Sequence, residues 1–210
     1  KTETSLVRSQ QKLSIAVVNK KVIFNNSIGD ISSVDIETGE LMWQTPTQSS
    51  VIYDDSFFLK TSDIIADNKN LYFSNNKGVF FSLDINKGTL NWKQNINSYL
   101  RPTLIDNYIF TVSDEGYFFI IEKISGNIIR VTDIFKNVKP KKRNKMKPTG
   151  FIVGKNDVYL TTDNGRLLVV DITTGKIKST IKVDRDKILR PSVLNESLFV
   201  ITENSIVKID

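Results

Sequence analysis

Ser33-Val-Asp35-Ile-Glu-Thr38-Gly39-Glu-Leu-Met-Trp43 returns further along the chain as Ser82-Leu-Asp84-Ile-Asn-Lys-Gly88-Thr-Leu-Asn-Trp92. Weaker copies surround Gly126 and Gly175. Each of these four glycines follows another glycine by ten residues, at positions 29, 78, 116 and 165. The glycines at 39, 88, 126 and 175 are 49, 38 and 49 residues apart, so a rigid unit is joined by connections of unequal length. Repetition at this period predicts a repeat architecture.

Each unit has the pattern of short strands separated by turns. Segments such as Val22-Ile-Phe and Leu71-Tyr-Phe are rich in β-branched and aromatic residues, which suit a pleated surface. Asn, Asp and Gly at the turns tolerate positive φ. With the apolar segment before each unit, the count is four strands in about forty residues, which is typical of a β-propeller blade. A helical solenoid is excluded because no stretch keeps apolar residues at i, i+3, i+4 and i+7 for three turns.

The repeats predict one all-β domain over residues 1–210, a β-propeller with five four-stranded blade units. The fifth unit lacks its outermost strand, and we expect residues 4–9 to supply it. This arrangement fits a closed five-blade wheel, and it fits equally the carboxy-terminal arc of a larger seven- or eight-blade wheel. The blade cores are expected at about residues 13–44, 62–93, 101–131, 147–181 and 190–210.

The pattern of a small residue, an acid, Thr-Gly and Trp resembles the repeat of quinoprotein (PQQ-type) propellers, over nearly the whole chain. The resemblance implies two branches of function. One holds dehydrogenases that bind pyrroloquinoline quinone and calcium, and the other is non-catalytic and includes the BamB family of outer-membrane assembly lipoproteins. The end of the chain on the third strand of its last unit is similar to the BamB branch. In this family the tryptophan docks against the neighbouring blade's turn, which implies structural docking roles for Trp43, Trp92, Gly39, Gly88, Gly126 and Gly175.

The composition of the chain excludes several kinds of covalent link, catalysis and membrane segment. The chain has no cysteine and no histidine, which excludes disulfides, thiolate catalysis and the usual general base near neutral pH. No apolar run approaches the roughly 20 residues of a membrane-spanning helix, so no transmembrane segment is predicted. No signal peptide begins at Lys1, so the chain is expected to be mature or cytosolic, and any lipid anchor would lie upstream.

Acids recur at one position of the repeat, at Asp35, Asp84, Glu122 and Asp171. Such side chains commonly bond the backbone amides of their own turn, and we expect that structural role here. No phosphate-binding loop and no calcium loop is present. The sequence therefore predicts no enzyme, no catalytic residue, no metal and no cofactor. The alternative is a quinone (PQQ)-dependent dehydrogenase or a fragment of one.

Positive charge is concentrated in the segment 136–147, the basic insert, which carries seven cations and no acid in a chain of net charge +6. It is either a docking loop for an acidic or anionic partner or a solvated loop. No aromatic residue interleaves it to stack bases, so nucleic acid is not an expected partner. Cations also precede a proline at the start of three innermost strands, which would gather them on one face. The predicted partner-binding residues are Arg101, Lys147, Arg190, Lys141, Lys142 and Arg143.

A second long connection, residues 45–62, contains Phe57 and Phe58 and is read either as an exposed apolar contact or as an extra hairpin. Taken together, these features predict a non-catalytic scaffold, a BamB-like component of outer-membrane β-barrel protein assembly. The expected location is the periplasm in association with the outer membrane. The expected partners are a membrane β-barrel assembly protein with acidic loops and unfolded outer-membrane proteins.

Overall fold

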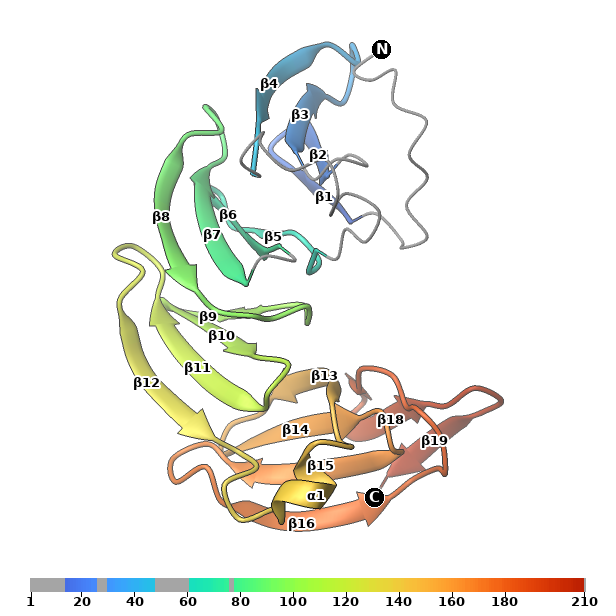
Figure 1. Ribbon diagram of the computed structural model, residues 1–210. Coiled ribbons are helices and arrows are strands. Elements are labelled where there is room, and N and C mark those ends of the chain that lie inside the picture. The colour runs from blue at the N-terminus through green and yellow to red at the C-terminus, as the bar shows by residue number, and fades with distance from the viewer. Residues whose placement is uncertain (1–13, 26–29, 48–60, 76–77, 210) are drawn as a thin grey trace. The chain divides into compact units, whose positions relative to one another are not determined.

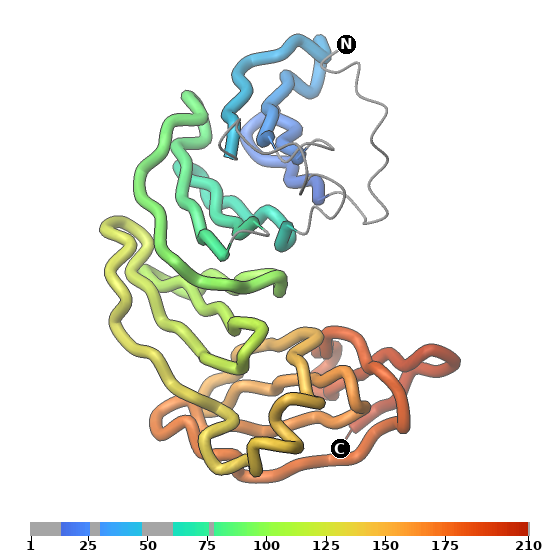
Figure 2. Tube along the Cα trace, in the orientation of Figure 1, coloured from blue at the N-terminus to red at the C-terminus, as the bar shows by residue number. Residues whose placement is uncertain are grey.

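The computed structural model describes residues 14–25, 30–47, 61–75 and 78–209, and nearly all of its regular structure is β-strand (Figure 1). The chain divides into two compact units, residues 1–102 and 103–210. The backbone trace in Figure 2 follows each sheet as a run of adjacent hairpins. No helix among the described residues is long and apolar enough to cross a membrane.

The first unit holds two four-stranded antiparallel sheets, in the orders β1-β2-β3-β4 and β5-β6-β7-β8. Each strand pairs with its neighbour in the sequence, so every sheet is a simple meander. The strands are β1 Ile15–Val18, β2 Lys21–Asn25, β3 Ile31–Asp35, β4 Leu41–Thr45, β5 Ile65–Ala66, β6 Asn70–Ser74, β7 Val79–Asp84 and β8 Leu90–Asn95.

The second unit holds two further four-stranded meanders and, within the described residues, a three-stranded one. A short helix, α1 (Pro140–Arg143), lies in the connection between the first two of these sheets. The strands are β9 Thr103–Ile105, β10 Tyr108–Val112, β11 Tyr117–Glu122, β12 Ile128–Asp133, β13 Pro148–Val153, β14 Asp157–Thr162, β15 Arg166–Asp171, β16 Ile177–Lys182, β17 Ser192–Leu194, β18 Ser197–Ile201 and β19 Ile206–Ile209.

The five sheets confirm the predicted all-β class and the division into five repeat units. Two differences from the sequence prediction stand out. The first strands β5, β9 and β17 have only two or three residues, whereas β13 has six, and the basic insert contains α1 where only a loop was predicted. Pro140 begins this helix, where its missing N–H costs nothing, and the amides of Lys142 and Arg143 donate to the carbonyl of Lys139. The expected closing strand 4–9, and Phe57 and Phe58, lie outside the described residues.

Apolar side chains from adjacent sheets form the core within each unit. In the first unit, β2, β3, β6 and β7 contribute most of a cluster in which Phe73 and Phe81 stack with ring centroids 5.3 Å apart. In the second unit, Leu167, Ile188 and Val200 are buried between the last two sheets. Residues along a strand alternate between the two faces of a sheet, so each sheet can place apolar side chains on both faces and pack against a neighbouring sheet on each side.

A bulged turn recurs before the fourth strand of each four-stranded sheet, next to the recurring acid. The register shifts there in all four sheets. In one example, the Gly88 amide donates to the Asp84 carbonyl at 2.9 Å and the Asp84 amide donates to the Thr89 carbonyl at 2.8 Å. Gly88 has φ of +67°, a conformation that glycine adopts without steric cost. The repeated acid and glycine therefore build one turn, used four times.

Candidate interaction surface

The recurring acids accept hydrogen bonds from their own turns. Asp35 Oδ1 accepts from the amides of Glu37 at 2.8 Å and Thr38 at 2.9 Å. These bonds stabilise the carboxylate and lower the pKa of Asp35 below its ordinary value. Asp84 makes the equivalent pair of bonds, and Glu122 accepts from the Ser125 hydroxyl. The expectation that these acids are ligands of their own turns is confirmed.

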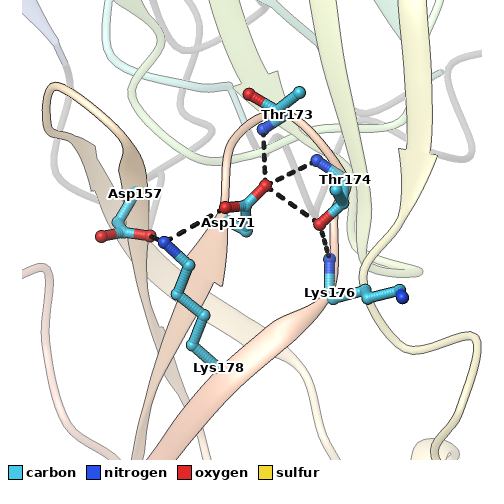
Figure 3. A network of polar contacts seen from close by, with 6 residues as sticks. All are labelled: Asp157, Asp171, Thr173, Thr174, Lys176 and Lys178. Atoms are coloured by element: carbon cyan, nitrogen blue, oxygen red, sulfur yellow. Dashed lines mark hydrogen bonds and ion pairs between the residues drawn. The ribbon is translucent and has the colours of Figure 1, made fainter.

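Asp171 carries the most extensive of these networks (Figure 3). Its Oδ1 accepts from the Thr173 amide at 3.0 Å and from the Thr174 amide and hydroxyl at 2.7 and 2.9 Å. Lys178 Nζ lies 3.1 Å from Asp171 Oδ2 and 2.6 Å from Asp157 Oδ1. The Thr174 amide, followed by Lys178, lowers the pKa of Asp171 from 3.8 to about 2. This carboxylate is thus fully partnered within its own sheet.

Trp43 and Gly88 form one of the contacts between the two sheets of the first unit. The Trp43 Nε1 donates to the Ile85 carbonyl at 3.1 Å, and the Thr45 hydroxyl donates to the Gly88 carbonyl at 2.7 Å. A Cβ on Gly88 would lie 2.5 Å from the Trp43 ring, so only glycine fits. The indole therefore lies on the turn of the next sheet.

Trp92 is buried against two aromatic rings of its own sheet. Its ring is stacked on Phe80 with centroids 6.1 Å apart, and it lies tilted against Tyr72 at 6.2 Å. Burial, and after it the charge of Asp67, raises the pKa of Tyr72. Trp92 thus contributes to the core of the second sheet.

Arg130 takes the place in the third sheet that tryptophan holds in the first two. Its Nη1 donates to the Thr173 carbonyl at 2.8 Å, in the turn of the following sheet. Beside it, Thr132 packs so closely on Gly175 that a Cβ there would lie 1.8 Å from Thr132 Cγ2. The sequence analysis predicts no role for Arg130. The signal was its position, four residues after Gly126, the same offset as Trp43 from Gly39.

The basic insert is tied to the third sheet by Arg143. Its Nη1 lies 2.8 Å from Asp133 Oδ2, its Nη2 donates to the Glu115 carbonyl at 3.2 Å, and its guanidinium lies 5.5 Å from the centre of the Tyr117 ring. Hydrogen bonding to Asp133 raises the pKa of Arg143. Phe135, just before the insert, and Met146, near its end, are buried. Arg143 therefore holds the insert in place, whereas Lys141 and Lys142 are exposed on α1.

The three cations before prolines have different surroundings. Arg101, in the first unit, is exposed. Lys147 is exposed while its backbone is paired with Asp163, whose carboxylate accepts from the Lys147 amide at 2.8 Å. Arg190 is half-buried, and its Nε donates to the Phe151 carbonyl at 2.9 Å. The common face of all three involves both units and stays a prediction.

Acidic groups do not gather in the described part of the chain: no three His, Cys, Asp or Glu side chains lie together there as a metal site requires.

This chain is similar to known proteins in both sequence and fold. Residues 1–132 match the family described as outer membrane protein assembly factor BamB. The crystal structure of BamB from Moraxella catarrhalis aligns with a TM-score of 0.60 at 15% identity, covering 92% of this chain and 70% of that one. The β-propeller domain of Cps50 (Swd1) from Myceliophteria thermophila aligns with a TM-score of 0.67 at 14% identity, covering 91% of this chain and 62% of that one. No curated protein matches the sequence. These matches confirm the PQQ-type repeat and the β-propeller class.

Proposed function

Because the chain belongs to the outer membrane protein assembly factor BamB family, we propose that it is a non-catalytic scaffold for protein–protein contacts in outer-membrane β-barrel protein assembly. The family match over residues 1–132 is the observation that carries this proposal. Its proposed place of action is the periplasm, in association with the outer membrane.

The use of the recurring acids supports a scaffold over a quinone enzyme. Such an enzyme requires a base for the alcohol proton and oxygen ligands for calcium. Here the most prominent repeated carboxylates accept bonds from their own turns, and Asp171 is also paired with Lys178. The structure thus uses these groups to shape turns. A rigid framework in turn lowers the ordering cost of binding a partner through its loops.

The proposed partner surface comprises, in each unit taken by itself, those of the predicted cations that the structure leaves exposed. Arg101, Lys147, Lys141 and Lys142 are exposed, and an acidic loop of a membrane β-barrel assembly protein is the partner that fits their charge. Arg143 and Arg190 are engaged with Asp133 and Phe151, so we propose that they position this surface. Unfolded outer-membrane proteins are further proposed partners, because extended segments add to exposed strand edges.

The test is capture of the barrel assembly protein from solubilised outer membranes on the immobilised chain, at two salt concentrations. Charge reversal in Arg101→Glu and Lys147→Glu together is expected to reduce capture at least tenfold at low salt, with a smaller effect at high salt. Lys155→Glu is the matched control, since Lys155 is exposed and follows the opposite end of β13 from Lys147. Equal capture by all three proteins would overturn the proposed surface, and no capture by the unaltered chain would overturn the proposed role.

A dehydrogenase is distinguished by a second measurement. Addition of pyrroloquinoline quinone and calcium is expected to leave the thermal unfolding temperature unchanged and to produce no dye-coupled oxidation of alcohols or sugars. A rise in unfolding temperature together with turnover would establish the enzyme in place of the scaffold.

A further inference from the structure

A cavity of about 550 Å³ lies between the basic insert and the fourth sheet of the chain. Its apolar lining is formed by Val138 and Met146 from the insert, Leu168 from β15 and Ile177 from β16. Leu168 and Met146 are buried, whereas Val138 and Ile177 are half-buried. In Figure 1, α1 is drawn in front of β15 and β16. The insert and these two strands all contribute lining residues, so the insert forms the second wall of the cavity. This volume is in the range of sites that hold a small organic molecule.

Four cations surround this apolar lining. Lys141, Lys142 and Lys145 come from the insert, and Arg166 comes from the start of β15. Arg166 and Leu168 are two residues apart on one strand, so both face the cavity side of the sheet. No acidic residue lines the cavity, and none of these four side chains forms an ion pair among the described residues. An anionic group at the mouth would therefore be attracted by all four.

We propose that this cavity binds a free single-chain aliphatic carboxylate, with the chain on the apolar lining and the carboxylate among the cations. Aliphatic CH₂ groups match the four apolar side chains, and flexible lysines can cover the chain with their own methylenes while keeping the ammonium groups in water. A bare inorganic anion would leave the apolar lining unused. This site goes beyond the proposed scaffold role and does not depend on it.

A peptide segment fits the cavity less well because its backbone N–H groups would need acceptors. Asn164 and Thr180 are the only uncharged polar residues of the lining. Asn164 Oδ1 already accepts from the Thr162 hydroxyl at 2.8 Å, and the Asn164 carbonyl accepts from Lys182 Nζ at 2.7 Å. A hydrocarbon chain has no such requirement.

Calorimetric titration with a matched series of probes tests the site. Decanoate is expected to bind at one site per chain, whereas acetate, which lacks the tail, and decyltrimethylammonium, which reverses the charge, are expected not to bind. Octanoate, shorter by two CH₂ groups, is expected to bind about tenfold more weakly than decanoate. Equal binding of decanoate and decyltrimethylammonium, or no binding of decanoate, would overturn the proposal. Tighter binding of a tail-free acidic peptide such as hexaglutamate would overturn it as well.

Substitutions locate the site without using the residues proposed for partner capture. Lys145→Glu with Arg166→Glu is expected to weaken decanoate binding at least tenfold, and Ile177→Trp, which fills the cavity, is expected to do the same at unchanged charge. The control Lys155→Glu changes charge to the same extent per site outside the cavity and is expected to bind normally. Normal thermal unfolding of each variant confirms that it is folded. Unchanged decanoate binding by both cavity variants would show that the anion binds elsewhere and would overturn the assignment.

Discussion

Trp43 donates from its indole Nε1 to the carbonyl oxygen of Ile85 at 3.1 Å, and this bond joins the last strand of one sheet to the turn of the next. The same indole lies over Gly88 and packs beside the apolar cluster of the first unit. One half-buried aromatic side chain thus adds both a hydrogen bond and ring packing to the apolar cluster that the two sheets share. We expect the stability of this unit to be sensitive to the side chain at this position.

Substitution of Trp43 separates these two contributions. Trp43→Phe removes the hydrogen bond but keeps an aromatic ring, and it is expected to lower the free energy of unfolding by about 1 kcal/mol. Trp43→Ala also removes the ring and is expected to cost about 3 kcal/mol. Urea unfolding followed by circular dichroism measures both. If Phe and Ala were equally destabilising, the ring itself would contribute nothing.

A comparison of Gly175 with Gly39 separates the effect of close packing at the bulged turn from the effect of backbone strain. Both have positive φ, at +69° and +72°, but only Gly175 has a neighbour where a Cβ would be added, the Thr132 methyl group. Gly39→Ala is expected to cost about 1–2 kcal/mol from backbone strain alone. Gly175→Ala is expected to cost more, and Thr132→Ala in the same chain is expected to restore part of the loss. Thermal unfolding checks this, and the absence of any restoration would contradict the proposed clash.

The lowered pKa of Asp171 predicts that the stability of the chain depends on pH. Its pKa is lowered from 3.8 to about 2 in the folded chain, so the folded state favours the charged form. This stabilisation is fully present above pH 3.8 and is lost as the pH falls toward 2. The difference in unfolding temperature between the unaltered chain and Asp171→Asn is therefore expected to shrink from pH 5 to about pH 2. A difference that stays constant over this range would show that the carboxylate charge is not involved.

Arg143 is expected to hold the basic insert on the third sheet. Arg143→Gln removes the ion pair with Asp133 and the position over Tyr117, at a cost of about 1 kcal/mol. We expect the amides of Lys142 and Met146, which are bonded within the insert, to exchange about fivefold faster with solvent. Hydrogen exchange measured by mass spectrometry reports this change. Lys136→Gln, at an exposed cation of the same insert, is the control and is expected to leave exchange unaltered.

The fold could be predicted from the sequence because the same residue types form the same kind of turn four times. Asp84 and Gly88 are close in the chain, so their turn follows from local chemistry. Arg130 was missed because its partner, the Thr173 carbonyl, is 43 residues away and belongs to the backbone, which carries no sequence signal. The helix α1 and the cavity beneath the insert were missed for a similar reason. The cavity is formed by residues of the insert, β15 and β16 that are distant in the chain, α1 is a single turn with no buried residue, and composition showed only the charge of the insert.

The self-contained turns explain how this architecture tolerates extensive divergence. The turns at Gly88 and Gly175 bond their own amides and are contacted by side chains of the preceding sheet, Trp43 with Thr45 in the first unit and Arg130 with Thr132 in the second. An indole and a guanidinium can each donate a hydrogen bond to a backbone carbonyl, so the contact between the sheets is kept when the residue type changes. Evolution can therefore rewrite most of such a chain while the scaffold persists, which is consistent with a shared fold at 15% identity.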